Sequence, residues 1–101
     1  MDAPDLQFEV LTPLDFRVRV TRRYWQLITT VKHPVMANRE SEVIEALQNP
    51  DEVRVSKKDT AVLLFYKGQG QHRWVCAVTK KLNGDGFLIT AYLTDAIKRR
   101  D

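Results

Sequence analysis

The chain changes from helical to strand periodicity after Pro50, and this change constrains the fold more than any other feature. From that point, short runs rich in valine, leucine, threonine and aromatic residues alternate with charged or glycine-containing turns. Such a pattern is typical of consecutive antiparallel strands joined as a meander. The expected strands cover residues 53–55, 60–67, 73–80 and 87–93.

The two central runs of this meander are apolar at both odd and even positions. Side chains of a strand alternate between the two faces of its sheet, so neither face is expected to be fully exposed to water. We expect one face to carry helices. The other face is expected to be a partly covered, concave surface that includes Thr90 and Tyr92.

Two helices are predicted before the meander. The first begins after Thr21, a suitable N-cap, and ends at His33-Pro34, because proline disfavours α geometry at the residue before it. His33 should therefore end this helix, where its side chain can project into a cleft. The second helix is predicted to begin at Asn38 as N-cap and to stop at Asn49-Pro50.

The first 20 residues add two short runs with strand character, 6–11 and 16–20, and the second alternates valine with Arg17 and Arg19. A short basic helix is expected over residues 95–100. The fold prediction is an α+β domain with two N-terminal helices packed on a four-stranded antiparallel sheet, plus a short extra β segment at the N-terminus.

Composition narrows the class of protein. With 101 residues and 44% hydrophobic side chains, the chain is expected to form one domain over residues 1–101. Cys76 is the only cysteine, which excludes an internal disulfide and suits a reducing cytoplasm. No signal peptide or apolar run of about 18 residues is present, so we expect a cytoplasmic protein without a membrane segment.

The charge is unevenly distributed along the chain, which carries +3 in all. Residues 1–50 contain six basic and seven acidic side chains, whereas residues 51–101 contain ten and six. This basic second half permits an anionic partner without requiring one.

No strong catalytic motif is present: the sequence lacks a glycine-rich phosphate loop in the right context, HExxH and GxSxG. A zinc site would need His33, His72 and Cys76, and a structural site normally needs a fourth nitrogen or sulfur ligand. Cys76 itself lies among apolar neighbours, where an inert buried thiol is the ordinary outcome. We therefore expect no metal and no cofactor.

The remaining polar candidates suit phosphodiester chemistry. Cleavage of RNA by its ribose 2′-hydroxyl needs a proton acceptor, a proton donor and fixed positive charge, and it needs no metal. Histidine can fill either proton role near neutral pH because its ordinary pKa is about 6.5. The candidate residues are Lys32, His33, Arg54, Lys80, Thr90 and Tyr92.

Three short motifs occur in order along the chain: Lys32-His33-Pro34, the leucine-x-x-Pro-Asp ending at Pro50-Asp51, and the Thr-x-Tyr of Thr90 and Tyr92. They lie within the segments 28–34, 43–53, 64–67, 75–80 and 89–98. In their order and spacing, these segments resemble the phage-type nuclease families of the barnase/EndoU/colicin/RelE-like group (BECR), over about residues 24–100.

The resemblance implies a metal-independent endoribonuclease of toxin or phage-derived type that forms a 2′,3′-cyclic phosphate. It implies that His33 is the acid/base residue, that Lys32 or Lys80 holds the phosphate, and that Thr90 and Tyr92 contact substrate. It also implies RNA as the partner, and it leaves open a neutralising antitoxin or immunity protein and the oligomeric state. The first 20 residues fall outside it.

Simpler interpretations of the same residues remain open. His33 could serve merely as a helix cap. The lysines and Arg54 could be solvated surface residues, and Thr90 and Tyr92 could be ordinary strand residues. Arg17 and Arg19 are expected to protect a sheet edge. The alternative function is a module of the same fold that binds RNA or a protein without catalysis.

Overall fold

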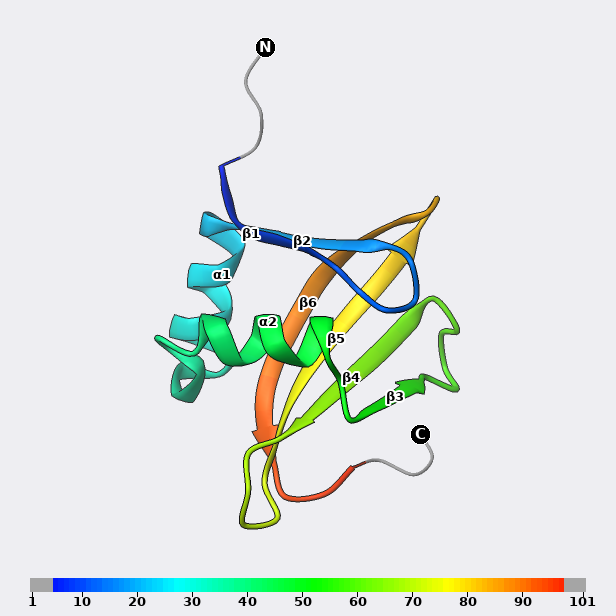
Figure 1. The fold of residues 1–101 in the computed structure, drawn as a ribbon. Coiled ribbons are helices and arrows are strands. Elements are labelled where there is room, and N and C mark those ends of the chain that lie inside the picture. Colours follow the sequence, from blue (N-terminus) through cyan, green and yellow to red (C-terminus); the bar gives the residue numbers. More distant parts are fainter. Residues whose placement is uncertain (1–4, 98–101) are drawn as a thin grey trace.

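The computed structural model describes residues 5–97, which form a six-stranded sheet in the order β1-β2-β6-β5-β4-β3 (Figure 1). Neighbouring strands are antiparallel except β2 and β6, which run parallel. The strands are β1 (Leu6–Leu11), β2 (Arg17–Thr21), β3 (Glu52–Val55), β4 (Val62–Gly68), β5 (Trp74–Leu82) and β6 (Asp85–Thr94).

The predicted fold is wrong in its sheet. The N-terminal segment is not a separate β addition, because β1 and β2 form a hairpin that extends the meander into a mixed sheet. β2 reaches β6 through two residue pairs, Val18 with Gly86 and Arg19 with Phe87. Burial of apolar surface favours this pairing. Val18 is fully buried when β2 lies beside the first residues of β6.

The first helical segment is shorter and less regular than predicted. Helix α1 covers Arg22–Leu27, and the Thr21 hydroxyl caps it by accepting a hydrogen bond from the Tyr24 backbone N–H at 3.1 Å. The chain then widens into a π-helical turn, η1 (Ile28–Lys32), followed by a short 3-10 turn, η2 (Pro34–Met36). The helices therefore contribute little to a protein that is mostly sheet.

The π-helical turn has a local cause in the threonine pair of its sequence. The Thr29 hydroxyl donates to the Trp25 carbonyl at 3.0 Å, and the Thr30 hydroxyl donates to the Gln26 carbonyl at 2.7 Å. Such side-chain bonds compete with the regular helical ladder. The wider turn leaves the Val31 side chain 70% exposed, so Val31 does not join the core.

Helix α2 spans Glu40–Gln48 and lies across β4 and β5 (Figure 1). The predicted N-cap, Asn38, is instead a turn residue with φ of 65°, and Arg39 occupies the N-cap position. The Arg39 guanidinium donates to the Glu42 carboxylate at 2.8 Å. The helix still stops before Asn49-Pro50, as the sequence predicts.

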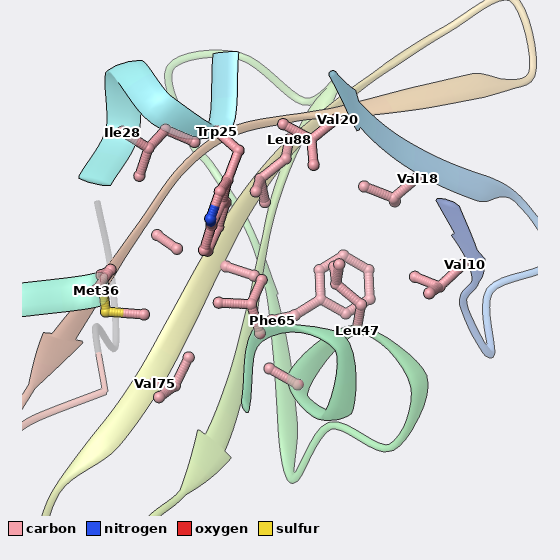
Figure 2. Packing of buried hydrophobic residues seen from close by; sticks show 14 of the residues in the cluster. Val10, Val18, Val20, Trp25, Ile28, Met36, Leu47, Phe65, Val75 and Leu88 are labelled. Carbon is pink, nitrogen blue, oxygen red and sulfur yellow. The ribbon is translucent and has the colours of Figure 1, made fainter. Parts of the chain in front are cut away.

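The main core lies between these helices and one face of the sheet (Figure 2). Phe65 and Leu47 are fully buried there, and the Trp25 side chain is 5% exposed. The helix-free face carries a smaller apolar cluster, which explains why the central strands are apolar at both odd and even positions. This cluster comprises Leu64, Tyr66 and Cys76, with Val62, Trp74, Val78, Tyr92 and Ile97 packed against it.

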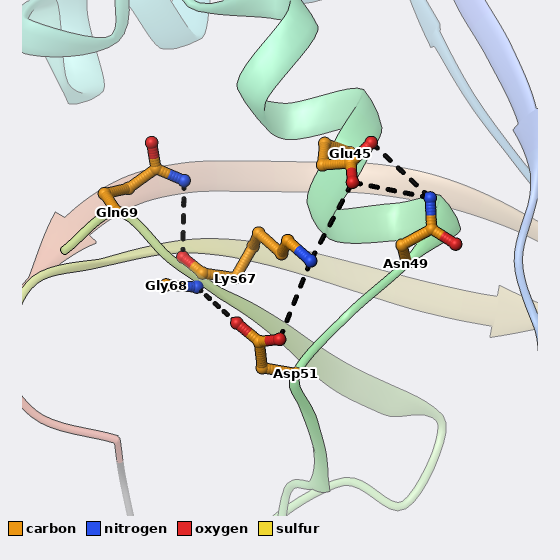
Figure 3. Close-up of polar contacts among 6 residues, drawn as sticks. All are labelled: Glu45, Asn49, Asp51, Lys67, Gly68 and Gln69. Atoms are coloured by element: carbon orange, nitrogen blue, oxygen red, sulfur yellow. Dashed lines mark hydrogen bonds and ion pairs between the residues drawn. The ribbon is translucent and has the colours of Figure 1, made fainter.

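A polar network joins the end of α2 to the end of β4 (Figure 3). The Lys67 ammonium lies 3.8 Å from the Glu45 carboxylate and 3.6 Å from that of Asp51. The second Asp51 oxygen accepts a hydrogen bond from the Gly68 backbone N–H at 2.7 Å. These contacts fix the turn by which the chain leaves α2 and enters β3.

After β6 the chain turns back toward the helix-free face. The Thr94 hydroxyl accepts a hydrogen bond from the Ala96 backbone N–H at 3.2 Å, and Ile97 packs against the smaller apolar cluster. Residues 95–97 are not helical, and the rest of the expected C-terminal helix lies outside the described residues.

Within residues 5–97, none of the helices has both the length and the apolar character needed to cross a bilayer.

Replacement of Gly86 by alanine tests the junction between β2 and β6. A Cβ atom there would lie 2.7 Å from the Phe16 ring and 3.1 Å from the Arg17 carbonyl oxygen. We expect Gly86→Ala to lower the free energy of unfolding by about 1–3 kcal/mol, measured by urea denaturation.

The neighbouring substitution Asp85→Ala is the control and should change stability by less than about 1 kcal/mol, since its ion pair with Arg19 is exposed. In the double variant Phe16→Leu/Gly86→Ala, the smaller side chain should relieve part of the clash. Additive losses would contradict a direct steric contact.

Candidate functional site

The free edge of β6 is where the predicted site residues gather. β2 accompanies β6 only at Gly86 and Phe87, and η1 and η2 lie along β6 beyond that point. The edge therefore combines strand residues 89–92 with the end of the first helical segment. We call this region, with Tyr24, Lys32, His33, Thr90 and Tyr92, the β6-edge site.

Ile89 forms the irregular centre of this edge. The pairing of β5 with β6 shifts register there, since Val78 faces Thr90 and Thr79 faces Leu88. Ile89 is thus the extra residue of a β-bulge. Its carbonyl accepts a hydrogen bond from the Tyr24 hydroxyl at 2.7 Å and another from the Lys32 ammonium at 3.2 Å.

The Lys32 ammonium is held at the surface by three contacts. Besides the Ile89 carbonyl, it donates to the Tyr24 hydroxyl oxygen at 2.8 Å and lies 5.0 Å from the centre of the Tyr24 ring. Lys32 is exposed, so its charge can still attract an anion from solution. The contacts place this positive charge one residue from Thr90 along β6.

His33 lies where η1 ends, as predicted. Its φ of −145° and ψ of 80° break the helical path before Pro34, and its backbone N–H donates to the Ile28 carbonyl at 2.7 Å. The half-buried imidazole packs against Tyr92 with ring centres 5.5 Å apart. The structure therefore brings together His33 and the strand residue selected from the Thr-x-Tyr pattern.

Tyr92 extends from this edge over the helix-free face. Burial raises the pKa of its hydroxyl far above the usual value, and interactions with Cys76 and Tyr66 raise it further. The phenol therefore stays protonated throughout the physiological range. Its hydroxyl is already hydrogen-bonded to Cys76 and Tyr66, and it cannot serve as a general base.

Thr90 lies two residues before Tyr92, on the same face of β6 and about 6.5 Å away along the strand. Its hydroxyl oxygen is buried and has no hydrogen-bond partner among residues 5–97. Buried hydroxyls are usually paired, so this one is a candidate contact for a ligand that displaces the side chains covering it. Besides the Tyr24 hydroxyl, which donates to the Ile89 carbonyl, the β6-edge site thus contains an imidazole, an ammonium and the two hydroxyls of Thr90 and Tyr92.

Lys80 and Arg54, also selected from the sequence, lie on the same face but are engaged elsewhere. The Lys80 ammonium pairs with the Asp59 carboxylate at 2.9 Å, and Arg54 pairs with Glu52. Arg54 is on β3, three strands from β6 and so about 14 Å across the sheet. Of the two lysines considered as phosphate ligands, only Lys32 belongs to the β6-edge site.

Sequence reasoning missed Tyr24 as a site residue, since its spacing indicated only an apolar helix face. The relevant signal is that Tyr24 precedes Lys32 by eight residues, which places both on one side of the helical segment.

The sequence analysis also considered His72 and Cys76, together with His33, as ligands of a zinc site. In the described part of the chain, no three histidine, cysteine, aspartate or glutamate side chains gather to hold a metal.

Comparisons with protein-family models, with curated proteins and with solved structures found no match to this chain.

The Asp59–Lys80 pair gives a testable electrostatic property of this face. The Lys80 hydrogen bond, followed by that from the Ala61 backbone N–H, lowers the pKa of Asp59 below its ordinary value of 3.8. We expect Lys80→Met to raise the Asp59 pKa, measured by NMR titration of the carboxyl carbon, whereas the exposed Lys58→Met should leave it unchanged.

The free energy of unfolding should depend on pH through this carboxyl group. Because the folded-state pKa of Asp59 is depressed, the pair stabilises the protein above pH about 4 and ceases to do so as the pH falls through the folded-state value. An Asp59 pKa that stays low in Lys80→Met would show that the lysine is not its cause.

Proposed function

We propose that this chain is a small metal-independent endoribonuclease of toxin or phage-derived type, and that the β6-edge site is its active site. The observation that carries the proposal is the contact between His33 and Tyr92, with ring centres 5.5 Å apart. Two segments that are distant in sequence, and that carry the resemblance to the BECR nucleases, meet at this point.

In the proposed reaction the neutral His33 imidazole removes the proton of a ribose 2′-hydroxyl. The resulting oxygen attacks the adjacent phosphorus, the bond from phosphorus to the 5′ oxygen breaks, and the imidazolium returns the proton to that oxygen. The products are a 2′,3′-cyclic phosphate and a free 5′-hydroxyl. No metal is needed, because fixed donors stabilise the charge.

The other groups of the site have roles that fit their environments. Lys32 supplies fixed positive charge beside Thr90, and the Thr90 hydroxyl has an unused hydrogen bond to offer to a phosphate oxygen. Tyr92 stays protonated and its hydroxyl is engaged with Cys76 and Tyr66, so its ring acts as a positioning group for the His33 imidazole.

A second candidate function is RNA binding without cleavage. One observation favours it: among residues 5–97, no carboxylate lies within ion-pair distance of His33 to orient its ring or share its proton. A binding module would use the same donors to hold phosphate, so the two candidates differ in turnover and not in affinity.

The two histidines of the chain provide a matched test of the nuclease. His33→Asn should lower cleavage of single-stranded RNA in EDTA by about 10²- to 10⁴-fold, the usual contribution of one general acid or base. His72→Asn should cleave as fast as the wild type, since His72 is exposed in the β4–β5 turn and asparagine tolerates its φ of 58°. Product formation is followed by gel electrophoresis.

Both variants should keep the wild-type melting temperature within a few degrees. If the wild type binds RNA with a steep salt dependence but never cleaves it, the binding module replaces the nuclease. Equal rates of RNA cleavage by the wild type and His33→Asn would rule out the proposed mechanism.

A matched pair of lysines tests the phosphate contact. Lys32→Gln should lower kcat/KM by about 10²-fold, because an oriented donor to the phosphorane is lost. It should also reduce the salt dependence of RNA binding by about one charge. The exposed Lys58→Gln should change neither quantity, and a similar loss in both variants would indicate only general attraction to a basic surface.

A further inference from the structure

A groove opens between β2 and β6 beside the β6-edge site. The two strands pair at only two positions and then diverge, and Tyr24 of α1 fills part of the gap between them. The groove has a volume of about 440 Å³, within the range of small-molecule sites. It is lined by Arg19, Val20, Thr21, Tyr24, Phe87, Leu88 and Ile89.

The walls of this groove are mostly apolar and include two aromatic rings. Phe87 is 41% exposed, which is a large exposure for a phenylalanine on a strand. Arg19 pairs with Phe87 in the sheet register, and its guanidinium forms ion pairs with the carboxylates of Glu9, at 3.8 Å, and Asp85, at 3.5 Å. The groove therefore combines a flat apolar surface with an ion-paired guanidinium at its side.

The groove is continuous with the proposed phosphate site, since Tyr24 and Ile89 belong to both. The Lys32 ammonium bonds to Tyr24 and Ile89, and Thr90 follows directly. Phe87 lies three residues before Thr90, about 10 Å along the strand. That separation suits one nucleotide, with its phosphate at Lys32 and its base extending toward Phe87.

We infer that this groove is a nucleobase subsite, which holds one unpaired base of a single-stranded RNA against the Phe87 ring. The inference rests on the proposed function, because it takes RNA as the occupant of the neighbouring site. Unpaired bases stack on aromatic side chains and present polar edges to donors such as arginine. The subsite also gives the N-terminal hairpin a role, since β2 forms one wall.

Binding of an RNA analogue that cannot be cleaved tests the subsite separately from catalysis. The probe is a fluorescent single-stranded oligonucleotide with 2′-fluoro riboses, and binding is measured by anisotropy. Phe87→Ala should weaken binding about 5- to 100-fold, as expected for the loss of one stacked base. Phe87→Trp should keep wild-type affinity, and Leu82→Ala, a similarly exposed apolar residue on β5, should stay within about twofold.

An abasic probe identifies the part of RNA that the groove binds. When the missing base is the one that stacks on Phe87, found by moving the abasic position along the probe, wild type and Phe87→Ala should bind with equal affinity. The salt dependence of Phe87→Ala should match the wild type, because no phosphate contact is removed.

The outcomes separate this inference from the nuclease. If Phe87→Ala binds the 2′-fluoro probe as tightly as the wild type while RNA is still cleaved, the base subsite is wrong and the nuclease stands. If His33→Asn cleaves normally but Phe87→Ala loses base-dependent binding, the subsite stands and the proposed His33 mechanism is wrong. A Phe87→Ala loss that persists at every abasic position would show a groove that does not bind a base, such as a protein-docking surface, and would overturn the inference.

Discussion

The parallel contact between β2 and β6 at Gly86 is the constraint on which the architecture depends. Only glycine fits, because a side chain would meet the Phe16 ring at 2.7 Å, and that ring is itself packed edge-on against Phe65 with centres 6.3 Å apart. The close approach lets β2 join the sheet and bury Val18. Because the pairing ends after two positions, it also creates the groove and leaves the rest of β6 without a strand partner on that side. One residue without a side chain therefore defines both the join of the hairpin and the boundary of the candidate site.

The β6-edge site is built from two irregular backbone segments that satisfy each other's hydrogen-bonding needs. The bulge at Ile89 turns a carbonyl away from the ladder, and the helical segment supplies Tyr24 and Lys32 as its donors. The π-helical turn in turn brings His33 to the edge of β6. Bulges and π-helical turns both occur frequently at functional sites, because they redirect side chains that regular structure would hold elsewhere. Their meeting at one strand edge explains how a small, mostly β protein can place an imidazole, an ammonium and two hydroxyls together.

The sequence predicted the local features of this arrangement better than its long-range partners. Turn residues and alternation located the strands of the meander, and His33-Pro34 located the end of the first helical segment, because both signals lie within a few residues of their effect. The partner of β2 was missed, since the Val18–Gly86 pair joins residues far apart in the chain and depends on tertiary burial. The same limit applies to the cations: Lys80 was a reasonable phosphate ligand until Asp59, 21 residues earlier, was found against it. Side-chain type indicates what chemistry is available, whereas the choice between two lysines is made by neighbours that only the fold supplies.

The unpaired Thr90 hydroxyl bears on the proposed phosphate contact. A buried hydroxyl without a partner destabilises a protein by about 1–3 kcal/mol relative to a paired one, and a strand position is readily filled by valine at nearly equal volume. The hydroxyl of Thr79, a buried threonine on the neighbouring strand β5, is paired, because it donates to the Leu63 carbonyl at 3.2 Å. The difference lies in position: Thr79 is fully buried, whereas Thr90 lies on β6 between Ile89, whose carbonyl binds Lys32, and Tyr92, whose ring packs on His33. Under the proposed function, a phosphate oxygen that reaches this hydroxyl would accept its free hydrogen bond on the part of β6 where Lys32 is held.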